Sequence, residues 1–155
     1  MSKSLKRVAR ALEEAGLPDT IMEAGESRTA EQAANACGCA LDQIVKSIIF
    51  AGEESGAIRL FLTAGGNRIC TAKASALAGE ALGRADANLV RATTGFAIGG
   101  VSPLGHLSPS PIWMDPRLLE FDQVWAAAGT PRHVFSIDPQ VLMKLINAQP
   151  ADFVE

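Results

Sequence analysis

A single lysine stands within the apolar stretch Ile44–Phe50, where it could bind or orient a substrate. This stretch is rich in β-branched residues and predicts a strand. On alternating positions, Lys46, Ile48 and Phe50 would share one face of that strand. A buried ammonium group is costly unless it has a partner. Two interpretations remain open: Lys46 acts on a ligand, or it reaches solvent from a sheet edge or pairs with a carboxylate.

The second candidate is the glycine-rich segment Gly99–His106, whose sequence is Gly-Gly-Val-Ser-Pro-Leu-Gly-His. Consecutive glycines let the backbone approach a ligand closely, and backbone N–H groups can stabilise a developing oxyanion without a catalytic side chain. The spacing matches neither a phosphate-binding P-loop nor a dinucleotide fingerprint. A tight turn before a kinked strand is the alternative interpretation.

The histidines and cysteines do not form a catalytic or metal-binding pattern. They are His106, His133, Cys37, Cys39 and Cys70. Ser102 lies near His106, but no nucleophile-elbow pattern surrounds any serine. Cys37 and Cys39 are separated by one residue, whereas zinc and redox motifs usually have two. We therefore expect neither a metal nor a cofactor.

Length and composition predict one soluble domain spanning residues 1–155. The chain is 48% hydrophobic and 20% charged, and three cysteines give no disulfide framework. No apolar run is long enough to span a membrane, and the N-terminus does not resemble a signal peptide, so we expect a cytoplasmic protein. The net charge of −3 is not typical of a protein that binds nucleic acid through overall charge. An RNA substrate would need local basic patches and a specific pocket.

One such patch lies on the first expected helix, where basic residues recur at helical spacing. They are Lys3, Lys6, Arg7 and Arg10. They could contact the phosphates of a tRNA acceptor stem, or they could form the solvated face of an amphipathic helix.

The expected elements alternate between helices and short strands. Helices are expected over residues 4–15, 29–38, 73–82, 85–92 and 138–148, and strands over 19–23, 44–50, 58–63, 68–71, 112–114, 123–127 and 133–136. Residues 94–106 are interpreted as a strand that passes into a structured loop. Short, hairpin-like strands favour an α+β fold with a mixed sheet over a regular βαβ fold.

Two motifs taken together resemble the YbaK/ProX-type aminoacyl-tRNA editing family, which includes the editing domain of bacterial prolyl-tRNA synthetases. They are Gln43-Ile-Val-Lys-Ser47 and Thr94-Gly-Phe-Ala-Ile-Gly-Gly-Val-Ser-Pro-Leu-Gly-His106. The segments Arg28–Ala34 and Val124–Thr130 are also similar to this family, so the resemblance covers nearly the whole chain. It implies a mixed, curved β-sheet flanked by helices, with a pocket beside the strand that carries Lys46.

The resemblance implies a trans-editing deacylase that hydrolyses the ester of a mischarged amino acid on tRNA, commonly proline tRNA, without a metal. By position, Lys46 matches the functional lysine of the family, and Gly99 and Pro103 match its Gly-x-x-x-Pro loop. The catalytic candidates are Lys46, Gly99, Gly100 and Val101, and the substrate-binding candidates are Ser27, Thr29, Ser102, Pro103, His106 and His133. The expected partners are mischarged tRNA and prolyl-tRNA synthetase, but neither a membrane nor DNA.

Two other function classes stay open at this point. One is a tRNA- or protein-binding module that keeps the fold without hydrolysis. The other is a hydrolase of small esters that depends on a cysteine or a serine. The amino acid that is removed also stays open among cysteine, alanine, serine, threonine and others, since an apolar pocket discriminates poorly between side chains that differ by one methylene.

Overall fold

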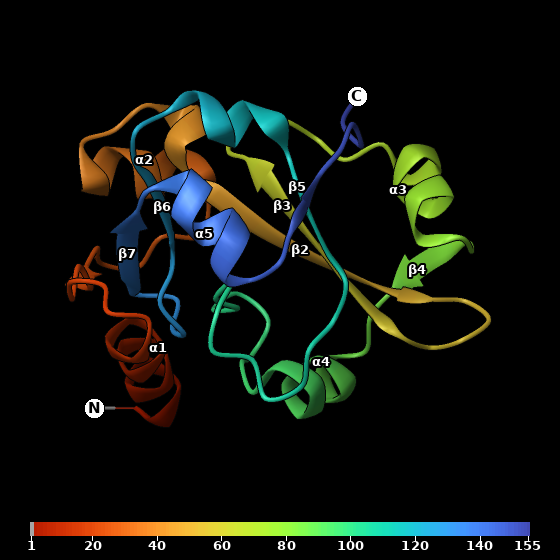
Figure 1. The fold of residues 1–155 in the computed structure, drawn as a ribbon, viewed down its shortest axis with the longest axis horizontal. Coiled ribbons are helices and arrows are strands. Elements are labelled where there is room, and N and C mark those ends of the chain that lie inside the picture. Colours follow the sequence, from red (N-terminus) through yellow and green to blue (C-terminus); the bar gives the residue numbers. More distant parts are fainter. Residues whose placement is uncertain (1) are drawn as a thin grey trace.

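The computed structural model describes residues 2–155, which form an α+β fold (Figure 1). Its helices are α1 (Lys3–Glu14), α2 (Ala30–Cys37), α3 (Thr71–Ala78), α4 (Ala87–Thr94) and α5 (Pro139–Leu145), with short 3₁₀ helices η1 (Leu41–Gln43) and η2 (Pro116–Glu120). Its strands are β1 (Met22–Glu23), β2 (Val45–Gly52), β3 (Ile58–Ala64), β4 (Leu82–Arg84), β5 (Ile112–Met114), β6 (Val124–Ala127), β7 (His133–Ile137) and β8 (Gln149–Pro150).

The strands form two sheets that meet at one bridge. The larger sheet has the order β4-β2-β3-β5-β8 and is mixed, because β2 is antiparallel to both β3 and β4 whereas β5 is parallel to both β3 and β8. The smaller sheet, β1-β7-β6, is antiparallel. A parallel bridge between Ile44 and Trp125 connects β6 to the start of β2. The expected mixed α+β fold and the β2–β3 hairpin are confirmed.

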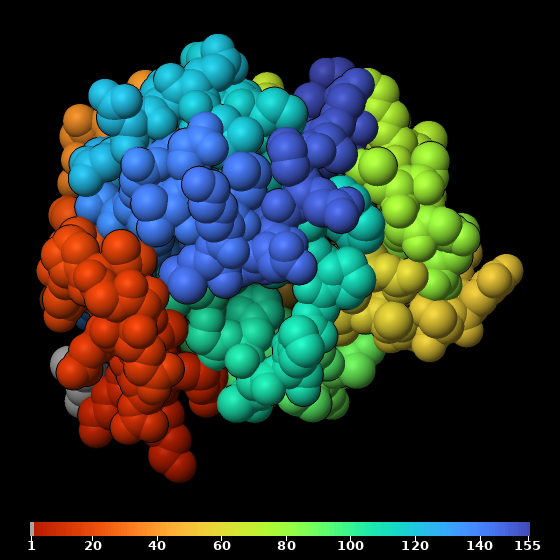
Figure 2. All heavy atoms as spheres, in the orientation of Figure 1, coloured from red at the N-terminus to blue at the C-terminus, as the bar shows by residue number. Residues whose placement is uncertain are grey.

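Alternation along β3 divides the apolar residues between two cores. Leu60 and Leu62 join the main core with Phe96 and Phe135. Phe61 points to the other face and belongs to a smaller cluster that also contains Trp113 and Phe153. On the face shown in Figure 2, α5 covers the sheets, and α1 lies at the edge of the molecule.

Two expectations for the middle of the chain are wrong. The helix expected over residues 73–82 instead spans Thr71–Ala78, and Gly79, with a φ of 81° in the left-handed region, terminates it. Residues 82–84 then form β4 and pair with β2. The strand expected over residues 68–71 is reduced to one bridge between Ile69 and Val154, because the first helical turn takes its last residue.

The strand expected within residues 94–106 is also wrong. Helix α4 extends to Thr94 and ends at Gly95, which has a φ of 84°. The buried Thr94 hydroxyl donates to the Val90 carbonyl and accepts from the Phe96 N–H, which turns the chain into a loop. The last helix also ends earlier than residue 148, and β8 follows it.

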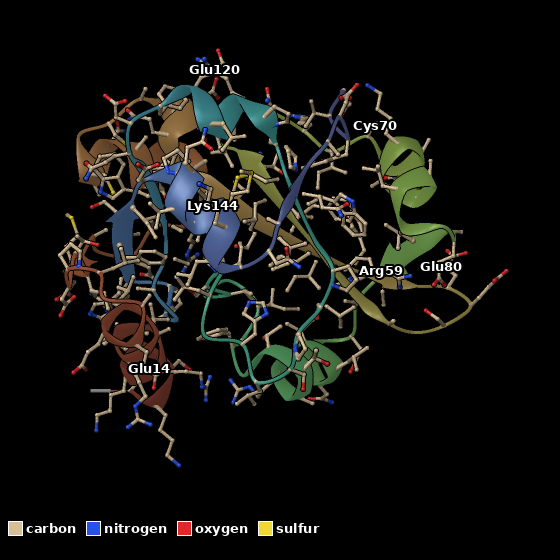
Figure 3. The ribbon with its side chains drawn as sticks, in the orientation of Figure 1. Glu14, Arg59, Cys70, Glu80, Glu120 and Lys144 are labelled. Atoms are coloured by element: carbon tan, nitrogen blue, oxygen red, sulfur yellow. The ribbon has the colours of Figure 1, made fainter. Side chains whose placement is uncertain are left out.

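A half-buried ion pair fixes the far end of the β2–β3 hairpin. Figure 3 shows Arg59 and Glu80 next to each other at the end of the molecule opposite α1, and their side chains are 2.9 Å apart. Glu80 also accepts hydrogen bonds from the Ser55 hydroxyl and N–H and from the Glu54 N–H. The bonds from Ser55 and then from Arg59 lower the pKa of Glu80 to about 2.

Candidate active site

A cleft of about 270 Å³ lies where β2, α2, β6 and the start of β7 meet the glycine-rich loop. The sequence candidates that line it are Ser27, Thr29, Lys46, Gly99, Val101 and His133. Helix α2 lies on this side of the cleft and begins at Ala30, and the hydroxyl of its N-cap residue, Thr29, accepts the Gln32 N–H. Thr29 therefore caps α2 and borders the cleft at once.

Lys46 has a backbone partner rather than a carboxylate. Its Nζ donates to the carbonyl oxygen of Asn67 at 2.5 Å, and its side chain is half-buried. An ammonium group has three N–H donors, so two stay available after this bond. Lys46 is thus held at the cleft by one bond and can offer its positive charge to a bound ligand.

A buried aspartate holds the turn that positions Lys46. Asp115 is 2% exposed, and its Oδ2 accepts hydrogen bonds from the Asn67 side-chain amide at 2.8 Å and from the Ala64 N–H at 3.1 Å. Its Oδ1 accepts the Arg117 N–H at 3.0 Å. Sequence reasoning missed Asp115, because an aspartate before a proline signals only a helix cap. Its contact with Asn67 arises from tertiary structure.

The glycine-rich loop presents backbone donors to the cleft. The Gly100 N–H donates to the Ala97 carbonyl at 3.0 Å and is therefore not free for a ligand. Within residues 2–155, the N–H groups of Gly99 and Val101 have no hydrogen-bond partner. Gly99 and Val101 line the same cleft as Lys46, so their unpaired amides are candidate donors to an oxygen atom of a ligand.

Helix α1 supports this loop through Arg7. The Arg7 Nη1 donates to the Gly95 carbonyl at 3.0 Å, and its guanidinium lies 5.3 Å from the centre of the Phe96 ring. The other basic residues of this helix, Lys3, Lys6 and Arg10, are exposed. The Arg7 side chain is thus engaged in contacts within the fold. The other three basic residues of the expected patch face solvent.

The opposite wall comes from the smaller sheet. Along β6, Val124 and Ala126 are buried, Trp125 and Ala127 are half-buried, and residues 125–127 line the cleft. The Nδ1 of His133 lies 2.7 Å from the Thr130 hydroxyl. Ser47 also lines the cleft, and its buried Oγ has no hydrogen-bond partner among the described residues. The alternation of β6 signals an outward Trp125, but its place beside Lys46 depends on the pairing between the two sheets.

Three substrate-binding candidates do not reach this cleft. Ser102 is buried, while Pro103 and His106 line a separate hollow of about 370 Å³ beside the ends of α1 and α5. The Nε2 of His106 lies 2.6 Å from the Ser102 carbonyl oxygen. Burial first, and then the nearby Arg7 charge, lower the pKa of His106 and favour its neutral form. Gly100 is buried and is likewise not among the cleft residues.

The three cysteines are not among the residues that line the cleft, and the environment of Cys37 and Cys39 disfavours thiolates. Burial and the adjacent Cys39 raise the pKa of Cys37 to about 11, and burial raises the pKa of Cys39. Figure 3 shows Cys70 beside α3, away from the cleft.

In residues 2–155, no three His, Cys, Asp or Glu side chains are grouped as metal ligands. None of the helices in the same range has both the length and the apolar character to cross a membrane.

Comparison with known proteins identifies the family. Residues 24–145 match the model of the aminoacyl-tRNA editing domain. The chain belongs to this family. The match includes Lys46, the glycine-rich loop and His133, and the expected YbaK-type editing fold is confirmed.

Two solved structures match this editing domain over its full length, and a further relative matches it over three quarters. A crystal structure described as a candidate trans-editing enzyme for prolyl-tRNA synthetase is 46% identical, with a TM-score of 0.91 over 100% of this chain and 99% of the other. A protein from a study of computational epitope grafting onto scaffolds is 44% identical, with the same TM-score and coverage. The uncharacterized YwhH of Bacillus subtilis is 34% identical over 116 residues, which are 75% of this chain and 73% of YwhH.

Proposed function

We propose that this editing domain is a deacylase that hydrolyses the ester between a mismatched amino acid and the terminal adenosine of tRNA, with proline tRNA as the first candidate. The observation that carries the proposal is the anchored Lys46 ammonium in the same cleft as the free N–H groups of Gly99 and Val101. This arrangement offers one positive charge and two backbone donors to a polar substrate.

The reaction needs little beyond positioning, because an aminoacyl ester is already activated. Water adds to the carbonyl carbon, the bond to the ribose oxygen breaks, and the ribose leaves as its hydroxyl while the amino acid is released. The N–H groups of Gly99 and Val101 would stabilise the oxyanion that forms. Lys46 would anchor the ribose or the terminal phosphate and so orient the ester. Neither a metal nor a cofactor is assigned a role.

Other cleft residues suit the terminal adenosine. The half-buried Trp125 offers an aromatic face, and bases stack readily on such faces. Ser27, Thr29 and His133 also line the cleft and complete the proposed substrate-binding set. Outside the cleft, Lys3, Lys6 and Arg10 are proposed to contact acceptor-stem phosphates. We also propose a cytoplasmic location. We propose prolyl-tRNA synthetase as a partner, because the 46% identical relative is described as a candidate trans-editing enzyme for that synthetase.

The proposal is tested by measuring deacylation of proline tRNA charged separately with alanine, cysteine, serine, threonine and proline. Wild type should release one mismatched amino acid selectively. Lys46→Ala should slow this release at least about a hundredfold, the loss typical of removing one electrostatic group from an active site. Lys144→Ala is the matched control, because Lys144 is exposed on α5 (Figure 3) and should leave the rate unchanged.

Each other outcome points to a different function class. Tight tRNA binding without release of any amino acid would favour the binding module over the deacylase. Loss of activity when Cys37, Cys39 and Cys70 are all changed to alanine would favour a cysteine-dependent hydrolase. We expect the cysteine-free variant to retain deacylation, because none of these thiols lines the cleft.

A further inference from the structure

A second hollow adjoins the cleft on the side of α1. This side compartment, about 500 Å³ in volume, is lined by Ser2, Leu5, Glu26, Thr130, Pro131, Arg132 and His133. Thr130, Pro131 and His133 also line the cleft, so the two hollows share one rim. A ligand that outgrows the cleft can therefore continue into the side compartment without leaving the protein surface.

The proposed substrate does outgrow the cleft. At about 270 Å³, the cleft lies at the lower limit of sites for small ligands, which occupy roughly 300–1,000 Å³. An amino acid joined to adenosine fills such a volume, so the nucleotides that precede the adenosine must extend past the rim. The side compartment is the adjoining hollow that shares this rim.

The side compartment offers one exposed guanidinium to a phosphate, that of Arg132, and contains one lining carboxylate, that of Glu26. Arg132 has a side chain that is 60% exposed, and its Nε lies 3.9 Å from the exposed carboxylate of Glu23. Exposed ion pairs of this kind contribute little and leave the guanidinium available to another anion. The acidic lining residue, Glu26, is paired with Arg28 at 3.4 Å.

Local contacts fix Arg132 close to the rim. Its N–H donates to the Thr130 hydroxyl at 3.1 Å, and this hydroxyl lies 2.7 Å from the Nδ1 of His133 in the cleft. Leu5 and Pro131 supply apolar surface on which a base can rest. Lys3 and Lys6, neighbours of the lining residues Ser2 and Leu5 in the sequence, add exposed positive charge nearby.

We propose that the side compartment binds the single-stranded nucleotides that precede the terminal adenosine of charged tRNA, with Arg132 contacting their phosphates. This inference rests on the proposed deacylase function and adds a subsite for the RNA strand. It assigns Arg132 to substrate binding and gives it no part in the chemical step.

The test compares two substrates that carry the same amino acid: charged full-length tRNA and aminoacyl-adenosine, which lacks the preceding nucleotides. Arg132→Ala should raise KM for the charged tRNA roughly tenfold to a hundredfold, as expected for the loss of one charge-assisted hydrogen bond, with kcat unchanged. The same variant should hydrolyse aminoacyl-adenosine like wild type. Arg132→Lys should recover part of the tRNA affinity. Arg84→Ala, an exposed arginine on β4 at the opposite end of the molecule, is the matched control (Figure 1).

The remaining outcomes distinguish this inference from the proposed function. Equal KM values for wild type and Arg132→Ala would overturn the subsite, and so would equal losses on both substrates, because these would place Arg132 in the cleft. If wild type hydrolyses neither substrate, the deacylase proposal fails, and binding of an uncharged RNA oligonucleotide ending in CCA decides the subsite alone. Weaker RNA binding by Arg132→Ala, but not by Arg84→Ala, would support the subsite. No RNA binding by wild type, or equal binding by wild type and Arg132→Ala, would overturn the subsite.

Discussion

At the scale of single residues, the main result is how the protein keeps an ammonium group in a half-buried cleft. Among the described residues, Lys46 forms no ion pair, and its partner is the Asn67 carbonyl oxygen. A carboxylate at this place would neutralise the charge, whereas a carbonyl orients it and leaves it available to the substrate. The negative charge lies one step further away, on the buried Asp115 that holds the Asn67 side chain.

Removing the Asp115 carboxylate tests this arrangement. Asp115→Ala would leave three donors without a partner and should lower the free energy of unfolding by about 2–4 kcal/mol. Because Asn67 would lose its support, deacylation by the remaining folded protein should fall by about tenfold or more. Urea unfolding and single-turnover rates measure the two effects separately.

Two further variants make this prediction sharper. Asp115→Asn keeps one acceptor oxygen and should lie between wild type and Asp115→Ala in both measurements. Asp122→Ala changes an exposed aspartate and should alter neither. Wild-type activity in folded Asp115→Ala would show that Asn67 does not need Asp115 to position Lys46.

At the scale of elements, local signals predicted structure wherever the pattern was complete within one segment. The helix at the N-terminus, the cap at Thr29 and the β2–β3 hairpin were all predicted, because each depends on periodicity, a cap or a turn. Strand β4 was missed because it has only three residues, too few to show the alternation of a strand. The residues of β2 with which it pairs also lie thirty or more positions earlier in the sequence.

The candidate site could be predicted only in part for the same reason. Lys46 could be singled out because a charged residue within an apolar strand is unusual. Gly99 could be singled out because two consecutive glycines are also unusual. Nothing local connects Lys46 to Asn67, or Trp125 to the cleft, because strand pairing and a turn bring these residues together. His106 was grouped with the glycines by sequence, yet it lies in another hollow.

The loop and its neighbour are packed so closely that Gly100 should accept no side chain. A Cβ at Gly100 would lie 3.0–3.2 Å from backbone atoms of Thr130, and a Cβ at Gly129 would lie 2.7 Å from the Ser4 carbonyl oxygen. Thr130 therefore cannot easily move away, because α1 packs behind it. Gly100→Ala should lower the free energy of unfolding by about 1–3 kcal/mol and slow deacylation, because Gly99 and Val101 would shift.

Gly56→Ala separates this effect from the general cost of losing a glycine. Gly56 lies in the β2–β3 hairpin at a φ of 71°, with no atom within 4 Å of an added Cβ. This variant should lose about 1–2 kcal/mol through backbone strain but keep full deacylation. Equal activities of the two variants in the folded state would mean that the contact with Thr130 does not position the loop.

At the scale of the whole molecule, the two ends are specialised differently. The cleft and the side compartment are lined by residues at the end with α1, α2, β6 and β7, which Figure 1 shows on one side of the molecule. The opposite end carries the Arg59–Glu80 pair (Figure 3). The net charge of −3 repels RNA overall, so binding has to rely on the exposed cations near the cleft. A domain of this size usually unfolds in one cooperative step, so a contact at the far end still contributes to the stability of the cleft.

The pH dependence of stability should reveal this coupling through Glu80. Since its folded pKa of about 2 lies below the ordinary value of 4.5, the carboxylate stabilises the fold fully above that ordinary value, and this contribution is lost as the pH falls toward 2. Glu80→Gln should therefore be less stable than wild type at pH 7, and the difference should shrink between about pH 5 and pH 2. Urea unfolding across this range measures the difference, and deacylation at pH 7 should stay unchanged, since Glu80 is remote from the cleft. A difference in stability that stays constant with pH would show that the Glu80 charge does not act in this way.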